Sequence, residues 1–206
     1  GVCAAATAQV VKVKGAGVND GTTVANAIAD QTISEDSALS FQFNTNVFSD
    51  VDAGDSFTYT ATLSDDSALP SWLSFDADTR TFSGTPLNAN VGVLAVKVIA
   101  TDGSSSAITD TFNLTVTNTN DAPTVANAIS DQTIAEDSAL DFQFNSNVFA
   151  DVDDGDTLSY TATLSDESAL PSWLSFDADT RTVSVPTLNA HVGTIDVNVI
   201  ARDDAA

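Results

Sequence analysis

The sequence predicts an all-β protein made of two tandem Greek-key β-sandwiches of seven strands each. Three observations predict it: an internal duplication, short segments in which apolar and polar residues alternate, and turn-forming Asp, Gly, Pro and Asn between those segments. Residues 23–103 match residues 124–204 at 60 of 81 positions without a gap. A period of 101 residues is too long for a solenoid unit and suits complete domains joined end to end.

Seven segments of the first copy have the composition or the alternation typical of strands. In residues 39–43, for example, Leu39, Phe41 and Phe43 alternate with polar residues, which indicates a half-buried strand. No segment combines helical periodicity with helix caps, so a Greek-key sandwich is the simplest arrangement. In chain order the predicted strands are residues 24–33, 39–43, 57–63, 73–75, 81–83, 94–100 and 111–116.

The duplication divides the chain into an N-terminal segment of residues 1–18, a first repeat of residues 19–121 and a second repeat of residues 122–206. The first repeat has a final strand, and the second repeat lacks its counterpart. The N-terminal segment carries a surplus candidate strand that precedes Asn19-Asp20 as residues 112–116 precede Asn120-Asp121. This strand consists of Val10, Val11, Lys12, Val13 and Lys14.

Two explanations of these ends stay open. A longer array could have been cut at arbitrary points. Alternatively, the N-terminal strand of one subunit completes the second sandwich of the next, which builds a head-to-tail polymer by donor-strand exchange. The surplus strand is basic, whereas the gap borders Asp196, Asp203 and Asp204.

Composition excludes several partners. The chain has 29 acidic and 6 basic residues and a net charge of −23, which argues against nucleic acid and anionic membranes and favours cations. No apolar run reaches the roughly 18 residues that a membrane span needs. The abundance of Thr, Ser, Asp and Ala with few lysines is typical of a secreted bacterial protein. Cys3 is the single cysteine, so no disulfide forms within one chain.

Acidic and amide residues recur at fixed places, and here the sequence resembles the cadherin superfamily, most closely the bacterial dystroglycan-type cadherin-like repeats. The resemblance covers residues 19–204. It rests on the linker Asn118-x-Asn120-Asp121-x-Pro123, on Asp151-Val152-Asp153 followed by Gly155-Asp156 and Tyr160, and on Ala201-Arg202-Asp203. It implies cadherin/Ig-like sandwiches with Ca²⁺ ions where one repeat meets the next.

Calcium takes six to eight oxygen ligands from carboxylates, amides and backbone carbonyls. The resemblance carries a junction site onto Asn118, Asn120, Asp121, Asp151, Asp153 and Asp203, with Glu35 from the first repeat. It carries the equivalent upstream site onto Asn19, Asp20, Asp50, Asp52 and Asp102. Typical cadherins have an Asp-Arg-Glu element where residues 86–90 carry no acid, which predicts weaker binding. The alternative interpretation is that these acids only form turns.

No residues form a catalytic constellation, so the chain is not expected to be an enzyme. Trp72 and Trp173 could stack on a sugar, although core packing is the expected role. Asp76 and Asp78 resemble a glycosidase carboxylate pair but precede a turn, and His191 occurs in one copy alone.

The predicted function is therefore a structural or adhesive subunit of an extracellular bacterial fibre or adhesin, stiffened by calcium. Its partners would be other copies or neighbouring repeats, with glycans and surface proteins as further candidates. The alternative is a carbohydrate- or protein-binding accessory module of a larger secreted protein.

Overall fold

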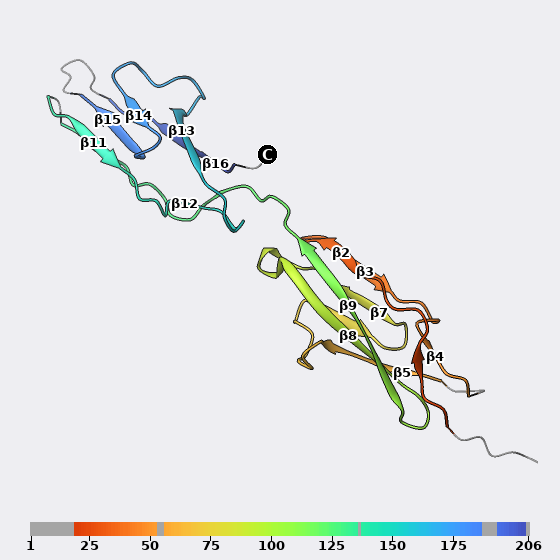
Figure 1. Ribbon diagram of the computed structural model, residues 1–206. Coiled ribbons are helices and arrows are strands. Elements are labelled where there is room, and N and C mark those ends of the chain that lie inside the picture. The colour runs from red at the N-terminus through yellow and green to blue at the C-terminus, as the bar shows by residue number, and fades with distance from the viewer. Residues whose placement is uncertain (1–18, 53–55, 136, 187–192, 205–206) are drawn as a thin grey trace, which may run out of the picture. The chain divides into compact units, whose positions relative to one another are not determined.

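The computed structural model describes residues 19–52, 56–135, 137–186 and 193–204 and divides the chain into two compact units (Figure 1). Unit 1 is Gly1–Thr117 and unit 2 is Asn118–Ala206. Both are built from β-strands, and the helical structure of the described residues is one 3-10 turn, Asn88–Asn90. The prediction of an all-β fold is confirmed.

Unit 1 is a sandwich of two sheets that together contain seven strands, with one further pair of short strands. Its strands are β1 (Thr23–Val24), β2 (Gln31–Ser34), β3 (Leu39–Gln42), β4 (Phe48–Ser49), β5 (Thr58–Leu63), β6 (Leu73–Asp76), β7 (Thr81–Gly84), β8 (Gly92–Thr101) and β9 (Ala107–Thr117). One sheet has the order β2-β9-β8-β5, the other has the order β3-β7-β6, and β1 pairs with β4. The β2-β9 pair is parallel, and the other pairs of unit 1 are antiparallel.

The first predicted strand is wrong in its extent, because residues 24–33 are divided between β1 and β2. Between the two strands the backbone bonds elsewhere: the Ala25 N–H donates to the Val47 carbonyl at 2.8 Å, and the Ile28 N–H donates to Asp110 Oδ2 at 2.6 Å. The interruption lets the two ends of the segment pair with different strands. The other six predicted strands are present, and β9 begins earlier than expected, at Ala107.

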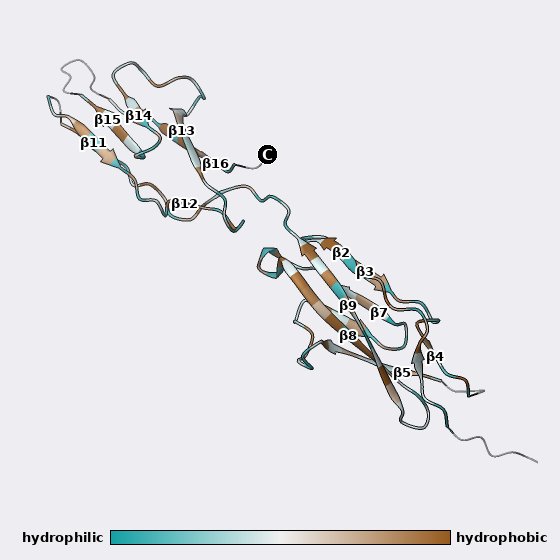
Figure 2. Ribbon diagram, viewed as in Figure 1, coloured by the Kyte–Doolittle hydropathy of each residue, from teal (hydrophilic) through white to brown (hydrophobic). Residues whose placement is uncertain are grey.

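The core of unit 1 lies between the two sheets. Val96 on β8 is 0% exposed, and Phe112 and Leu114 on β9 are 2% and 1% exposed. Phe82 of the facing sheet lies 5.5 Å from Phe112 and 4.6 Å from Phe75 between ring centroids. Figure 2 shows the apolar residues that recur along β8 and β9. Burial of each such side chain contributes roughly 1.5–3 kcal/mol, so β9 is a principal source of the stability of unit 1.

Unit 2 repeats this plan with fewer strands. Its strands are β10 (Thr124–Val125), β11 (Leu140–Gln143), β12 (Phe149–Ala150), β13 (Ser159–Leu164), β14 (Ser175–Asp177), β15 (Thr182–Val185) and β16 (Val197–Arg202). They form a three-stranded sheet of order β11-β15-β14 and the pairs β13-β16 and β10-β12. Residues 132–135, the counterpart of β2, are not a strand. Within the described residues, β16 pairs on one side, with β13.

One substitution between the copies changes the pairing in the smaller sheet. Leu73 at the start of β6 pairs with Gly84, whereas β14 begins at Ser175, so the equivalent pair is missing in unit 2. A Cβ atom on Gly84 would lie 1.9 Å from the Trp72 carbonyl oxygen. Val185 occupies the Gly84 position of unit 2, and a residue with a Cβ is not compatible with so close an approach, which agrees with the missing pair. Trp72 itself packs against the core of unit 1.

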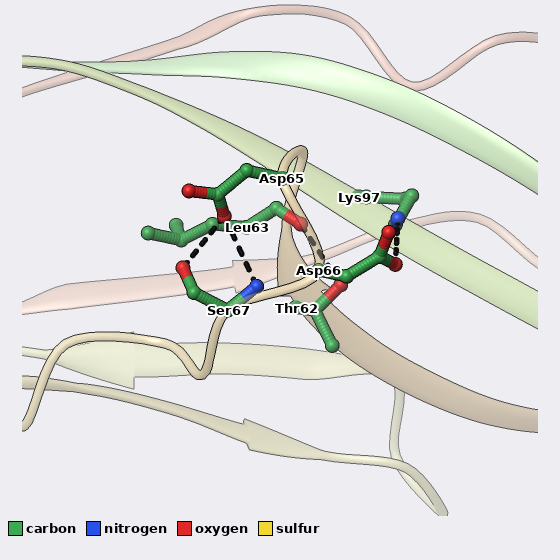
Figure 3. Close-up of polar contacts among 6 residues, drawn as sticks. All are labelled: Thr62, Leu63, Asp65, Asp66, Ser67 and Lys97. Atoms are coloured by element: carbon green, nitrogen blue, oxygen red, sulfur yellow. Dashed lines mark hydrogen bonds and ion pairs between the residues drawn. The ribbon is translucent and has the colours of Figure 1, made fainter.

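An equivalent turn follows β5 in unit 1 and β13 in unit 2, and Figure 3 shows the turn of unit 1. In unit 1 the Ser67 N–H and hydroxyl donate to Asp65 Oδ1 at 3.0 and 2.6 Å, which lowers the pKa of Asp65. Asp66 has a left-handed φ of 72° and forms an ion pair with Lys97. Unit 2 repeats the hydrogen bonds through Asp166, but its residue at the Lys97 position is Asn198.

Candidate metal centre

Three aspartates of unit 2 gather in the loop between β12 and β13. Asp151, Asp153 and Asp156 each offer a carboxylate oxygen, and the three oxygens lie within 4.8 Å of one another. The loop holds itself in place: the Asp153 N–H donates to Asp151 Oδ1 at 3.0 Å, as aspartate commonly does in turns. Gly155 has a φ of 104°, which side chains rarely permit, so the glycine allows the chain to return Asp156 to the cluster.

Two segments distant in sequence meet this loop within unit 2. The Asp121 N–H donates to Asp153 Oδ2 at 2.7 Å, and the Asn120 amide donates to Asp203 Oδ2 at 3.2 Å. Asp203 directly follows β16. Hydrogen bonds therefore join the linker residues to the acidic loop at Asp153 and to Asp203 after β16. Asn120, Asp121, Asp151, Asp153 and Asp203 are among the predicted calcium ligands, and that role stays a prediction.

The electrostatics of the cluster suit a divalent cation. Asp151 Oδ2 is buried and accepts no hydrogen bond from the described residues, and Asp153 is 5% exposed. Burial raises the pKa of Asp156, and nearby carboxylates, beginning with Asp204, raise it further. A bound cation would offset this repulsion between like charges. The donor set is entirely oxygen, as Ca²⁺ requires, so these residues fit the ion that the resemblance implies.

Asp156 was missing from the predicted ligands, although Gly155-Asp156 belonged to the motif on which the resemblance rests. The spacing Asp-x-Asp-x-Gly-Asp was the available signal. Asp204 is a second acid beside the cluster that was not predicted. It accepts hydrogen bonds from the Thr157 N–H and hydroxyl at 3.2 and 3.1 Å, which lower the pKa of Asp204.

The upstream residues repeat the arrangement in unit 1. The Asp20 N–H donates to Asp52 Oδ2 at 2.7 Å, and the Asp52 N–H donates to Asp50 Oδ1 at 2.9 Å. The loop continues through residues 53–55, which lie outside the described residues.

Asp102, the counterpart of Asp203, is 6% exposed. Its Oδ1 accepts hydrogen bonds from the Ser104 and Ser106 N–H groups, each at 2.8 Å. Burial opposes ionisation of Asp102, but these hydrogen bonds and the side chain of Asn19 outweigh it and lower the pKa of the carboxyl group.

The predicted ligands also include Glu35 and Asn118. Glu35 belongs to unit 1, is 1% exposed, and its N–H donates to the Thr117 carbonyl at 3.0 Å. Asn118 is the exposed first residue of unit 2. The predicted self-assembly strand, Val10 to Lys14, lies outside the described residues, as do Cys3 and His191.

The aspartates that resembled a glycosidase pair occupy turns. Asp76 Oδ1 accepts a hydrogen bond from the Thr79 N–H at 2.9 Å, and Asp177 accepts the equivalent bond from Thr180 at 3.1 Å. Both bonds close the turn at the end of a strand, which is a structural role for these acids.

Across the part of the chain that the structure describes, no helix has the length and apolar character of a membrane span.

Two similar proteins are adhesins. The chain is 32% identical over 135 residues to the serine-rich adhesin for platelets of Staphylococcus aureus strain USA300, an alignment that covers 66% of this chain and 5% of the adhesin. The same adhesin of strain MRSA252 is 32% identical over 135 residues, with 9% of its length covered. The chain thus spans a small part of the curated relatives it matches.

Among solved structures, the extracellular cadherin domains 3–6 of protocadherin gammaB7 match 89% of this chain and 47% of theirs, with a TM-score of 0.52 and 17% identity. This likeness shows a shared cadherin-like sandwich fold. A family model described as "Putative Ig domain" matches residues 21–117 and 122–206, close to the two structural units. The chain therefore belongs to this Ig-domain family, with two tandem members of it in 206 residues.

Proposed function

We propose that this protein is an adhesive extracellular module of the dystroglycan-type cadherin-like class, and that calcium bound at its acidic loops stiffens it. The adhesin relatives and the cadherin-like fold support the adhesive role. The net charge of −23 supports a cation as the bound ligand. The absence of a catalytic constellation in the sequence agrees with a binding role.

A single observation carries the calcium assignment: Asp151 Oδ2 is buried among acidic oxygens and accepts no hydrogen bond from the described residues. A buried carboxylate oxygen without a donor is costly unless a cation or water satisfies it. Asp151, Asp153, Asp156 and Asp203 would supply carboxylate ligands, and Asn120 would add an amide oxygen. When bound, the ion supplies positive charge that these ligands share.

Stiffening follows from where the ligands lie in the chain. Asn120 and Asp121 belong to the segment that directly follows unit 1, and they already contact Asp203 and Asp153. An ion held by the same loops would remove conformational freedom from this linker. We propose Asn118 and Glu35 as further ligands, and Asn19, Asp20, Asp50, Asp52 and Asp102 as the equivalent site of unit 1.

The test is a calcium titration of the full chain, followed by calorimetry, thermal melting and small-angle scattering. We expect dissociation constants of about 0.1–1 mM, as in other extracellular calcium modules, with a rise in melting temperature and a narrower range of interdomain distances. Asp151→Asn should remove most of the binding heat assigned to unit 2. Asp179→Asn, an exposed turn residue of the same unit, makes the same charge change outside the cluster and should leave it intact.

The proposal fails if millimolar calcium produces neither heat nor a change in melting temperature, or if Asp179→Asn weakens binding as much as Asp151→Asn. In the first case the acids would serve as turn formers alone.

Self-assembly by donor-strand exchange belongs to the same proposal, with other copies or neighbouring repeats as partners at a cell surface. The accessory-module alternative makes a different prediction: an isolated chain would bind carbohydrate directly. The test is binding of the isolated chain to a panel of plant and marine polysaccharides. Binding that is lost when exposed aromatic or polar residues are substituted would favour that alternative.

A further inference from the structure

The outer face of the three-stranded sheet of unit 2 carries a row of polar residues. Asp141 on β11, Ser184 on β15 and Ser175 on β14 are neighbours in the register of this sheet (Figure 1). Phe176, the next residue of β14, stacks on the buried Phe144 at 6.2 Å between ring centroids. Because successive side chains of a strand point to opposite faces, the polar row lies on the face away from the core.

A hollow of about 400 Å³ lies on this face, a size within the range of roughly 300–1,000 Å³ that small-molecule sites occupy. The half-buried Trp173, two residues before β14, lines it together with Asp141 and the hydroxyl-bearing residues Ser172, Ser175 and Ser184. The hollow therefore combines an aromatic surface with a carboxylate and hydroxyl groups. Such a combination of apolar contact and a few polar groups is typical of sites that orient a polar ligand.

Two substitutions between the copies make this surface specific to unit 2. Trp72 packs against the core of unit 1, where its Cε3 atom lies 3.2 Å from the position that a Cβ on Gly84 would take. Val185 has a Cβ at the equivalent position, so this close approach is not open to Trp173. The acid is the second difference, because unit 1 has Ser40 at the position of Asp141.

We propose that this hollow binds a neutral carbohydrate, with the apolar face of a sugar ring against the Trp173 indole. Asp141 Oδ1 accepts a hydrogen bond from the Ser184 hydroxyl at 2.5 Å, whereas Asp141 Oδ2 accepts none from the described residues. A carboxylate can accept several hydrogen bonds, so Asp141 would also accept one from a sugar hydroxyl. The inference goes beyond the calcium-stiffened adhesive module and gives the carbohydrate-binding alternative a site.

Charge restricts the class of carbohydrate. Asp141 is exposed, and none of the described residues that line the hollow is basic. The chain as a whole carries a net charge of −23. Sulfate and uronate groups would therefore meet like charge without a cationic partner, which disfavours anionic glycans. Sugar hydroxyls, in contrast, can donate to the carboxylate without this repulsion.

Titration calorimetry of the full 206-residue chain tests the proposal with four hexasaccharides. Cellohexaose, xylohexaose and mannohexaose are the neutral probes, and hexagalacturonate is the anionic probe. We expect saturable binding of at least one neutral probe and no measurable binding of the anionic probe. Trp173→Ala should weaken binding by more than about tenfold, as for aromatic residues at the centre of binding sites. Asp141→Ser, which installs the residue of unit 1, should weaken it by about tenfold through loss of a charge-assisted hydrogen bond.

Asp131→Ser is the matched control, because it makes the same charge change at an exposed position of unit 2 that does not line the hollow, and it should leave binding unchanged. Thermal melting of each variant checks folding, and Asp141→Ser keeps the test valid if Trp173→Ala does not fold. In a Trp72→Phe background, the bound sugar should change the fluorescence of Trp173.

The inference is overturned if no neutral probe binds, if binding survives both Trp173→Ala and Asp141→Ser, or if the anionic probe binds more tightly. Calcium binding, measured on the same variants, separates this inference from the calcium proposal, because neither Trp173 nor Asp141 is a proposed ligand. Loss of sugar binding with calcium binding intact supports the carbohydrate site. A chain that binds calcium but none of the neutral probes would refute this inference and leave the calcium proposal standing.

Discussion

Units 1 and 2 both contain the sequence Asp-Gln-Thr-Ile, as residues 30–33 and 131–134, yet it forms a strand in unit 1 alone. In unit 1 residues 31–33 of this sequence belong to β2, whose partner is β9. In unit 2 no described strand lies where β9 would be, and the segment stays irregular although its composition is unchanged. The core residues of the two units also differ in exposure. Ala100 of unit 1 is 0% exposed, whereas its counterpart Ala201 of unit 2 is half-buried.

The comparison teaches that β-propensity is satisfied only when a partner strand accepts the backbone hydrogen bonds. Isoleucine and threonine favour strands in both copies, but a strand at a sheet edge exists through its neighbour. The length of the neighbouring strand shows the same dependence, because β8 has ten residues and β16 has six. The segments on both sides of β9 in unit 1 thus differ from their counterparts in unit 2.

The largest effect is expected when the filling strand of unit 1 loses its central side chain. Phe112→Ala should lower the free energy of unfolding of unit 1 by about 3–5 kcal/mol, because a buried phenylalanine leaves a cavity that the sheets only partly close. Amide hydrogen exchange should show that residues 31–34 lose protection and approach the behaviour of residues 132–135.

Thr111→Ala is the matched control for this change, since Thr111 is the exposed neighbour on the same strand. A loss below about 1 kcal/mol for Phe112→Ala would contradict the assigned role of β9, because it would fall outside the range for buried aromatic residues.

An intermediate effect is expected from Gly84→Val, which gives unit 1 the residue found in unit 2. The new Cβ would meet the Trp72 carbonyl oxygen at 1.9 Å, so the start of β6 must move away from β7. We expect a loss of about 1–3 kcal/mol in unfolding free energy, typical of overpacking, together with a change in tryptophan fluorescence.

Val185→Ala in unit 2 is the control, because that unit already accommodates a side chain at this position. Unchanged stability for Gly84→Val would mean that the one-residue difference between β6 and β14 has another cause.

The smallest effect, and one that should be equal in both units, concerns the shared turn. Hydrogen bonds from Ser67 lower the pKa of Asp65, and those from Ser168 lower the pKa of Asp166. A carboxyl group whose pKa is lower in the folded state stabilises the fold above its ordinary value of 3.8, and this contribution disappears as the pH falls through the lowered folded value.

Asp65→Asn and Asp166→Asn should therefore each lower the melting temperature slightly at pH 7 and have little effect near pH 2. Thermal melts from pH 2 to pH 7 measure this difference. A larger loss from Asp65→Asn would indicate that the positive charge of Lys97, whose position in unit 2 is held by Asn198, also stabilises the Asp65 carboxylate.

Much of the fold followed from the residues alone. Period-2 alternation located six of the seven main strands of unit 1, because a half-buried strand needs apolar side chains on one face whatever its partners are. The position of the acidic loops was also predictable from the sequence. In an Asp-x-Asp segment the first carboxylate can accept a hydrogen bond from the N–H of the second aspartate, as Asp151 does from Asp153.

Tertiary structure decided what depends on distant partners. The division between β1 and β2 arises from Val47 and Asp110, which lie far along the chain from Ala25 and Ile28. Asp156 joined the cluster through the turn at Gly155. The fate of residues 30–33 and 131–134 depended on whether a strand lay beside them. Local sequence sets which face of a strand is apolar, but hydrogen bonds between strands are non-local, so the partner determines whether the strand forms.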